Sequence, residues 1–280
     1  MGAEMPENRI MKALLKRPDS EIYFEVTGSG PTLVFAHGLG GNYLSWWQQI
    51  PYFSERFTCI TFSQRGFWPN AASAAIPLPS VFAEDLSALI DHLQLETVAL
   101  VAQSFGGWTC LEYARHQPTR VRALIMASTT GTLNFAAIKH PELERLQKWR
   151  DWSGEEKIRL IGRGISLAAG ARMAEEQPAL HYLYQQINEL TPANFREALR
   201  TTIHNARTLS PESFAGLRIP LLFVTGEEDL LFPPAAAVAA ASLIPGACLK
   251  SMPQTGHSAY FERAGSFNKI VDEFLLKTIK

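Results

Sequence analysis

Ser104 stands in the segment VAQSFGGWTC, which runs from Val101 to Cys110 and places a serine between an apolar run and two glycines. A strand, a sharp turn carrying serine and a helix form the arrangement of the G-x-S-x-G motif, which exposes a nucleophilic hydroxyl at the end of a strand. Ala102 replaces the first glycine of that motif. Two interpretations are therefore open: Ser104 is a nucleophile, or it only caps the helix that follows.

A nucleophilic serine needs a base in hydrogen-bond reach and a third group that orients the base. Asp229 lies in GEEDLLFPP and His257 in PQTGHSAYFE, each just after a predicted strand. Because the carboxyl ends of parallel strands meet at one edge of an open sheet, we expect Ser104, Asp229 and His257 to converge there. The neighbouring Glu227 and Glu228 are alternatives for the acid, with Glu228 the next choice after Asp229.

Short apolar runs and amphipathic segments alternate along most of the chain. The pattern predicts strands over 11–17, 21–28, 32–38, 57–63, 97–102, 121–128, 219–226 and 248–252, and helices over 43–50, 80–93, 106–116, 233–243 and the C-terminal segment. Compact apolar runs are typical of strands that are buried on both faces of a parallel sheet. We therefore predict a doubly wound α/β fold, with Ser80 as N-cap of the helix over 80–93.

Residues 132–210 interrupt this alternation, because they show helical patterns and no convincing strand. Helices are predicted near 141–152, 155–167, 171–187 and 192–208. The strand–helix alternation resumes at Ile219. We therefore expect residues 1–131 and 211–280 to form one core domain, and 132–210 to form an all-helical cap inserted between two strands of its sheet.

The composition points to a small-molecule partner. Lys plus Arg (26) nearly balance Asp plus Glu (27), and no run of like charges suggests a nucleic-acid partner. No stretch approaches the roughly 18 consecutive apolar residues of a membrane span. Cys59, Cys110 and Cys248 lie far apart and are expected to be buried free thiols in a reducing compartment. We expect a cytoplasmic protein, and the sequence leaves its oligomeric state open.

Four segments in this order resemble the α/β-hydrolase fold superfamily. HGLGG (37–41) resembles its oxyanion loop, AQSFGG (102–107) its nucleophile elbow, GEED (226–229) its acid turn and GH (256–257) its histidine loop. The resemblance spans about residues 20–280, with 132–210 in the place of the family's variable cap. It implies a mostly parallel central sheet flanked by helices.

The resemblance also implies a role for each motif residue. Ser104 would be the nucleophile, His257 the general base and then acid, and Asp229 the group that orients His257. The backbone N–H groups of Leu39 and Phe105 would form the oxyanion hole. We expect no cofactor and no metal site.

The segment FSQRGFWPN (62–70) departs from the family pattern D-x-R-G-x-G-x-S. Arg65 and Gly66 remain, whereas Ser63, Trp68 and Asn70 replace Asp, Gly and Ser. We hypothesise that the bulky Trp68 packs against the cap or narrows the entrance to the site.

These features predict a serine hydrolase that cleaves carboxylic esters or lactones of small, mostly apolar substrates through an acyl-enzyme. Trp46, Trp68 and Trp108 are candidates for lining its pocket, which we expect to be mostly hydrophobic.

Other activities remain open. A C–C bond hydrolase of ring-cleavage products uses a similar triad, although Gln103 stands where such enzymes usually have Asn. Perhydrolase or haloperoxidase-like chemistry and cofactor-free oxygenase chemistry share the same residues. Epoxide hydrolases and haloalkane dehalogenases are disfavoured, because they need a carboxylate where this chain has Ser104. The alternative outside the enzymes is a small-molecule sensor that retains the triad.

Overall fold

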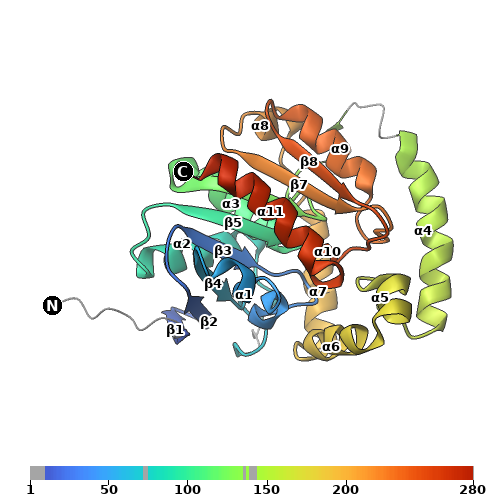
Figure 1. The fold of residues 1–280 in the computed structure, drawn as a ribbon, viewed down its shortest axis with the longest axis horizontal. Helices are drawn as coiled ribbons and strands as arrows, with labels where there is room; N and C mark the ends of the chain where they lie inside the picture. Colours follow the sequence, from blue (N-terminus) through green and yellow to red (C-terminus); the bar gives the residue numbers. More distant parts are fainter. Residues whose placement is uncertain (1–9, 72–74, 135–136, 139–143, 280) are drawn as a thin grey trace.

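The computed structural model describes residues 10–71, 75–134, 137–138 and 144–279, and it is built around one eight-stranded sheet of order β1-β2-β4-β3-β5-β6-β7-β8 (Figure 1). β2 runs antiparallel to β1 and β4, and the remaining neighbours are parallel. The strands are β1 (Met11–Arg17), β2 (Ser20–Thr27), β3 (Thr32–Ala36), β4 (Thr58–Phe62), β5 (Val98–Gln103), β6 (Val121–Ala127), β7 (Leu221–Gly226) and β8 (Cys248–Met252). The predicted mostly parallel α/β sheet is confirmed.

Helices cover both faces of the sheet. They are η1 (Tyr43–Trp46), α1 (Ile50–Phe53), α2 (Pro79–His92), α3 (Gly106–His116), η2 (Pro118–Arg120), α8 (Pro211–Ala215), α9 (Pro234–Leu243), α10 (Ala259–Glu262) and α11 (Ala264–Thr278). α2 begins at Pro79 with Leu78 as its N-cap, so the prediction of Ser80 was wrong by two residues. Proline at the first helical position loses no hydrogen bond, because that N–H has no partner within a helix.

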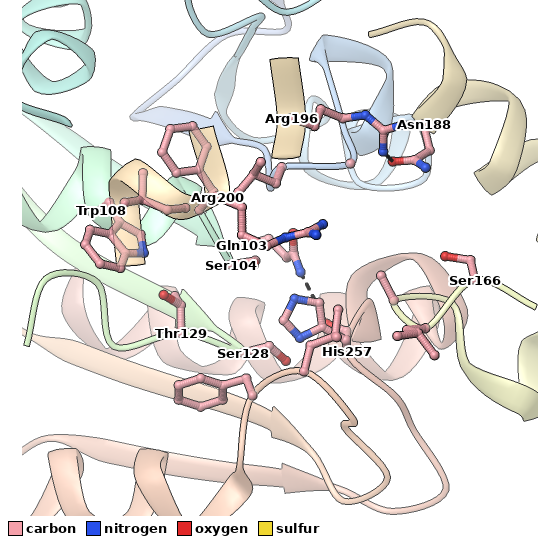
Figure 2. A pocket seen from close by; sticks show the side chains of 18 of the residues that line it. Gln103, Ser104, Trp108, Ser128, Thr129, Ser166, Asn188, Arg196, Arg200 and His257 are labelled. Carbon is pink, nitrogen blue, oxygen red and sulfur yellow. Dashed lines mark hydrogen bonds between the residues drawn. The ribbon is translucent and has the colours of Figure 1, made fainter. Parts of the chain in front are cut away.

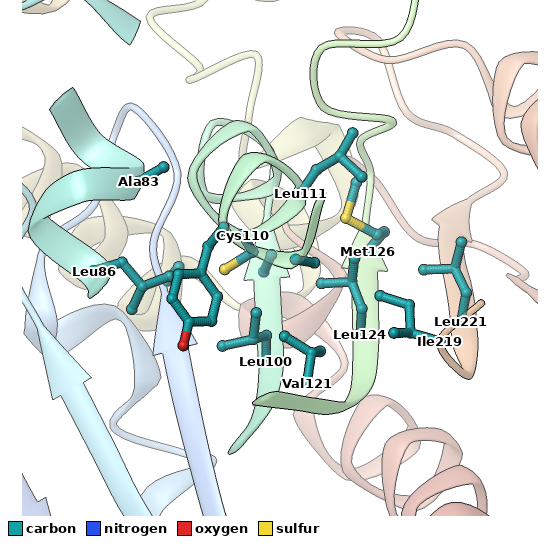
Figure 3. Packing of buried hydrophobic residues seen from close by; sticks show 14 of the residues in the cluster. Ala83, Leu86, Leu100, Cys110, Leu111, Val121, Leu124, Met126, Ile219 and Leu221 are labelled. Atoms are coloured by element: carbon teal, nitrogen blue, oxygen red, sulfur yellow. The ribbon is translucent and has the colours of Figure 1, made fainter. Parts of the chain in front are cut away.

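The central strands are apolar on both faces because each face carries its own core. Leu100 and Ala102 of β5 contribute to a cluster that includes residues of α2, α3 and α9, whereas Ala99 and Val101 contribute to the cluster that includes residues of α11. Figure 3 shows Cys110 and Leu111 of α3 packed over β5 and β6. This two-sided burial explains why the strand sequences lack alternation.

Between β6 and α8, the described part of the chain forms four helices that we call the helical insert: α4 (Glu144–Gly162), α5 (Gly170–Glu176), α6 (Pro178–Glu189) and α7 (Ala193–Asn205). The chain leaves and re-enters the core at one place, where Asn134 N–H donates to Leu209 O at 2.8 Å and Leu209 N–H to Thr132 O at 3.0 Å. In Figure 1, α4, α5 and α6 gather at one side of the molecule, away from α2 and α3.

The helix boundaries predicted within the insert were partly wrong. The two helices expected over 141–152 and 155–167 are one helix, α4, which runs through Gly154; residues 141–143 lie outside the described part of the chain. The helix expected over 171–187 is divided, because Pro178 starts α6 and cannot continue α5.

The predicted burial of the three cysteines is confirmed for two of them and wrong for the third. Cys59 and Cys110 are buried as expected, but Cys248 is exposed because it begins the edge strand β8. Among the described residues, no helix has both the length and the apolar character needed to cross a membrane.

A buried ion pair fixes the loop after β4 to α2. Arg65 donates to both carboxylate oxygens of Asp85 at 2.8 Å, and Arg17 Nε donates to Asp85 Oδ1 at 2.9 Å. The side chains of Arg65 and Asp85 are only 6% and 2% exposed. Asp85 therefore balances two guanidinium groups, of which Arg65 has only the exposed Asp19 as a further carboxylate partner.

Replacing Asp85 by Ala should lower the free energy of unfolding by about 3 kcal/mol, the lower end of the range for a broken buried pair, because the buried Arg65 keeps only the exposed Asp19 as a partner. Urea unfolding monitored by tryptophan fluorescence measures the change. The control Glu197→Ala breaks the exposed pair of Arg200 and Glu197 and should cost under about 1 kcal/mol. Equal losses in the two variants would contradict this assignment.

Candidate active site

Ser104 forms the sharp turn between β5 and α3. Its φ of 49° is in the left-handed region, which residues other than glycine adopt rarely and at a cost in free energy. The turn is fixed because Ser104 N–H donates to Ala127 O of β6 at 2.9 Å and Gly107 N–H donates to Ser104 O at 2.9 Å. A Cβ on Gly106 would lie 2.2 Å from the carbonyl oxygen of Ala36, so this position needs glycine.

Ala102 does not disturb this turn. Its methyl group is fully buried in the core cluster that β5 forms with α2, α3 and α9. A small side chain is accommodated there, so the glycine of the motif is dispensable at this position.

His257 is held by Asp229. Its Nδ1 lies 2.9 Å and 3.0 Å from the two carboxylate oxygens of Asp229, which is fully buried. Asp229 Oδ1 also accepts the backbone N–H groups of Leu231 and Phe232, both at 2.8 Å. A carboxylate in this position keeps the proton on Nδ1 and leaves Nε2 able to accept one.

The two alternative acids are turned away from the histidine. Glu228 forms an ion pair with Arg172, with the closest atoms 2.7 Å apart, and Glu227 accepts a hydrogen bond from Ser251 Oγ at 3.1 Å. Neither Glu227 nor Glu228 contacts His257 in the described structure. Of the three adjacent acids, the structure brings only Asp229 to the imidazole.

Ser104 and His257 line one cavity of about 580 Å³ (Figure 2). Gln103 Nε2–H donates to the backbone oxygen of His257 at 3.3 Å, which ties the turn at Ser104 to the histidine loop. No hydrogen bond joins Ser104 directly to His257 in the described part of the chain. Such contacts are often long in the absence of substrate and tighten when it binds.

Two residues of the same cavity lining have a backbone N–H without an acceptor in the described structure. Leu39 and Phe105 both line the cavity, and neither N–H donates to any acceptor within the described residues. Phe105 is also the N-cap of α3, whose dipole places partial positive charge at this end. Free donors beside a serine are suited to stabilise the oxyanion of a tetrahedral intermediate.

His37 shapes the loop that carries Leu39. Its Nδ1–H donates to Gly38 O at 2.8 Å, and its Nε2 accepts the N–H of Gln64 at 3.0 Å. Complete burial lowers the pKa of His37 to about 4, so the ring is neutral at physiological pH. A neutral ring with one donor and one acceptor fits both hydrogen bonds.

Comparison with known proteins identifies the family of this chain. The family model described as "alpha/beta hydrolase fold" matches residues 31–264. The chain belongs to this family.

Individual relatives of this α/β hydrolase are distant. It is 32% identical over 106 residues to 3-oxoadipate enol-lactonase 2 of Acinetobacter baylyi, a match that covers 38% of this chain and 40% of that protein. A solved N-acyl homoserine lactone degrading enzyme superposes with a TM-score of 0.77 at 23% identity, covering 94% of this chain and 100% of the other. A thermophilic esterase from Thermogutta terrifontis gives 0.73 at 21% identity, with 97% and 100% covered. At these identities, the two structural matches show the fold alone.

The tryptophans predicted to line the pocket of this hydrolase have different places. Trp108 does line the cavity. Trp46 is fully buried in the core against Tyr260, so it was wrongly assigned to the pocket. Trp68 is 37% exposed and also lies outside the lining, because its ring stacks on Tyr43 at 5.8 Å.

Trp68 does meet the helical insert, but through its backbone. Its N–H donates to Thr191 Oγ1 between α6 and α7 at 3.2 Å. The substituted residues of this loop bind one another through hydrogen bonds. Ser63 Oγ donates to Trp68 O at 2.8 Å, and Asn70 Nδ2 donates to Ser63 O at 2.7 Å. The altered loop thus has its own hydrogen-bond network.

The lining is more polar than the sequence predicted. Alongside apolar residues such as Leu39 and Ile203, four basic side chains contribute to it: Lys157, Arg196, Arg200 and Arg207. All four lie in segments that the sequence predicts to be helical, and a charged residue in such a segment is normally solvated. No group of three or more His, Cys, Asp or Glu side chains suited to a metal ion occurs within the described residues.

Glu262 supports the histidine loop and was not anticipated. Its Oε2 accepts the N–H of Gly256, the residue before His257, at 2.7 Å. The side chain is buried, and burial raises the pKa of Glu262 to about 7. The sequence shows an acid near the start of a helix, which normally indicates a solvated position.

Replacing Glu262 by Gln keeps an acceptor for Gly256 but removes the titration. Because the folded-state pKa is about 7 and the ordinary value is 4.5, the wild type loses stability as pH rises through that interval. As pH rises through this interval, the free energy of unfolding of E262Q minus that of wild type should increase. Above the interval, this difference should stay constant. Urea unfolding below, within and above the interval measures it, and a difference independent of pH contradicts the assignment.

Proposed function

We propose that this α/β hydrolase is a serine hydrolase that cleaves carboxylic esters or lactones without a cofactor. The contact between His257 and Asp229, facing the cavity that holds Ser104, carries the proposal. The unpaired N–H groups of Leu39 and Phe105 support it. The name of the enol-lactonase relative, which is 32% identical over 106 residues, supports lactones and esters as the substrate class.

The mechanism follows from these positions. His257 Nε2 takes the proton of Ser104 as Oγ attacks the carbonyl carbon, and the resulting oxyanion accepts hydrogen bonds from Leu39 and Phe105. His257 then gives the proton to the leaving alkoxide, which departs as the alcohol and leaves an acyl-enzyme. Water, deprotonated by His257, attacks this ester and releases the acid and free Ser104.

We assign the helical insert the role of a cap over this site. α4 reaches the acid turn, where Trp149 Nε1–H donates to Asp229 O at 2.8 Å. α6 reaches the histidine loop, where Ser258 Oγ donates to Tyr184 Oη at 2.9 Å. A cap connected in this way contributes to the substrate pocket and also supports the two catalytic turns.

Ser104→Ala should reduce hydrolysis of p-nitrophenyl esters by at least about a thousandfold, because the nucleophile is lost. Wild type should react with a serine-directed fluorophosphonate, with the label on the peptide that contains Ser104. A pre-steady-state burst followed by steady turnover supports an enzyme. Full activity in Ser104→Ala, or a single slow turnover with ligand-dependent thermal stabilisation, would reject the proposal, and the latter would favour a sensor.

Asp229→Asn should lower kcat by about 10⁴-fold, because an amide no longer selects the Nδ1–H tautomer of His257. The matched control is Glu228→Gln, which removes a neighbouring carboxylate paired with Arg172 on the surface and should leave kcat within about twofold of wild type. Steady-state kinetics on one p-nitrophenyl ester compares the variants. The reverse order of effects would make Glu228 the acid.

A further inference from the structure

The wall that the helical insert contributes to the cavity is positively charged. Lys157 comes from α4, Arg196 and Arg200 come from α7, and Arg207 follows α7 with its guanidinium 5.3 Å from the centre of the Trp108 ring. None of the described residues that line the cavity is an Asp or Glu. In Figure 2, Arg196 and Arg200 are labelled in the upper half of the view and His257 in the lower half.

Two of these cations have an opposite charge at hand. Arg200 forms an ion pair with Glu197 on the exposed face of α7. Lys157 is under the electrostatic influence of the buried Asp229, which opposes the lowering of the Lys157 pKa by burial. Their charges are therefore at least partly balanced within the protein.

Arg196 is held by neutral groups. Its Nη1–H donates to Asn188 Oδ1 at 2.6 Å, and its Nε–H donates to Thr191 O at 3.1 Å. In the part of the chain that the structure describes, Arg196 forms no ion pair, and its Nη2 donates no hydrogen bond. The exposed Glu189 influences the charge of Arg196 only from a longer distance. Burial and the neighbouring charge of Arg200 lower the pKa of Arg196.

A partly buried guanidinium without a paired carboxylate costs free energy, and an anionic ligand in the cavity would remove this cost. Elsewhere in this chain, Arg172 and Arg263 both pair with Glu176, so Arg196 is unlike them. A planar guanidinium binds a carboxylate through two parallel N–H···O bonds. The position of Arg196 in the wall of the cavity is thus suited to a carboxylate on the substrate.

We propose that the substrates of this hydrolase are esters or lactones that carry a free carboxylate, and that Arg196 binds this carboxylate; the inference rests on the proposed function. Arg196 is then a specificity-determining residue. The substrate is therefore expected to be a monoanion, whereas the sequence predicted a mostly apolar substrate.

The anchor of Arg196 lies beside the oxyanion loop. Asn188 Oδ1 would be 2.5 Å from a Cβ built on Gly40, which directly follows Leu39. The same oxygen accepts the hydrogen bond from Arg196. A carboxylate bound at Arg196 therefore lies in a fixed relation to the loop donor and orients the scissile carbonyl toward it.

Matched pairs of esters test the preference. The p-nitrophenyl monoesters of glutaric, adipic and pimelic acid carry a free carboxylate, and their methyl esters are the neutral partners. Wild type should show a kcat/KM at least about tenfold higher for the charged member of one or more pairs, because a charge-assisted hydrogen bond is gained. Equal kcat/KM within all three pairs overturns the inference, while the proposed function stands.

Three variants identify the group responsible. Arg196→Gln should lower the charged-to-neutral ratio about tenfold or more, mainly through KM, and Arg196→Lys should restore part of it. The control Arg159→Gln removes an exposed charge on α4 that is paired with Glu156 and should keep the wild-type ratio. An unchanged ratio in Arg196→Gln, or an equal loss in Arg159→Gln, overturns the inference.

Binding to Ser104→Ala tests charge recognition without hydrolysis. Calorimetry should show monomethyl adipate binding at least about tenfold more tightly than dimethyl adipate, with the preference lost when Arg196→Gln is added. Equal affinities, or no binding of either ligand, overturn the inference. A clear preference in a protein whose wild type hydrolyses none of the esters would reject the proposed function and leave the anion site intact.

Discussion

The close backbone approach at the end of β5 is the constraint on which the site depends. The chain must reverse at Ser104 with a positive φ, and α3 must begin so near β3 that only a hydrogen fits at Gly106. The same crowding recurs around the turn, because a Cβ on Gly38 would lie 2.1 Å from Gln103 Oε1 and one on Gly107 would lie 2.4 Å from Thr129 Cγ2. The cores on both faces of the sheet hold this strained turn in place.

The core and the turns that carry the candidate catalytic residues could be predicted because their signals are local. Buried strands are apolar runs in the sequence. Ser104 and Asp229 each follow such a run, and His257 follows the short edge strand β8 at the same edge of the sheet. Ala102 was accommodated because its methyl group points into a core. Trp46 and Trp68 were misplaced because tryptophan is equally suited to a core, a surface stack or a pocket, and only tertiary packing decides among them.

The helical insert was less predictable for a physical reason. A boundary was predicted near Gly154, but α4 runs through this residue. A single helix was predicted across Pro178, but this proline starts a new helix, α6. Arg196 and Glu262 look like ordinary solvated charges in the sequence. Their roles depend on neighbours from other segments. Arg196 donates to Asn188 and Thr191, and Glu262 accepts a hydrogen bond from Gly256.

The bridge between Leu133 and Leu209 makes the insert a replaceable module. Because both ends meet at one point of the core, segments of different length could join β6 and β7 without shifting their register, and a longer closed loop adds little entropic cost. Evolution could thus exchange the charged wall while the strained turn and the histidine loop stay unchanged. Recognition and bond cleavage would then diversify at different rates within one lineage.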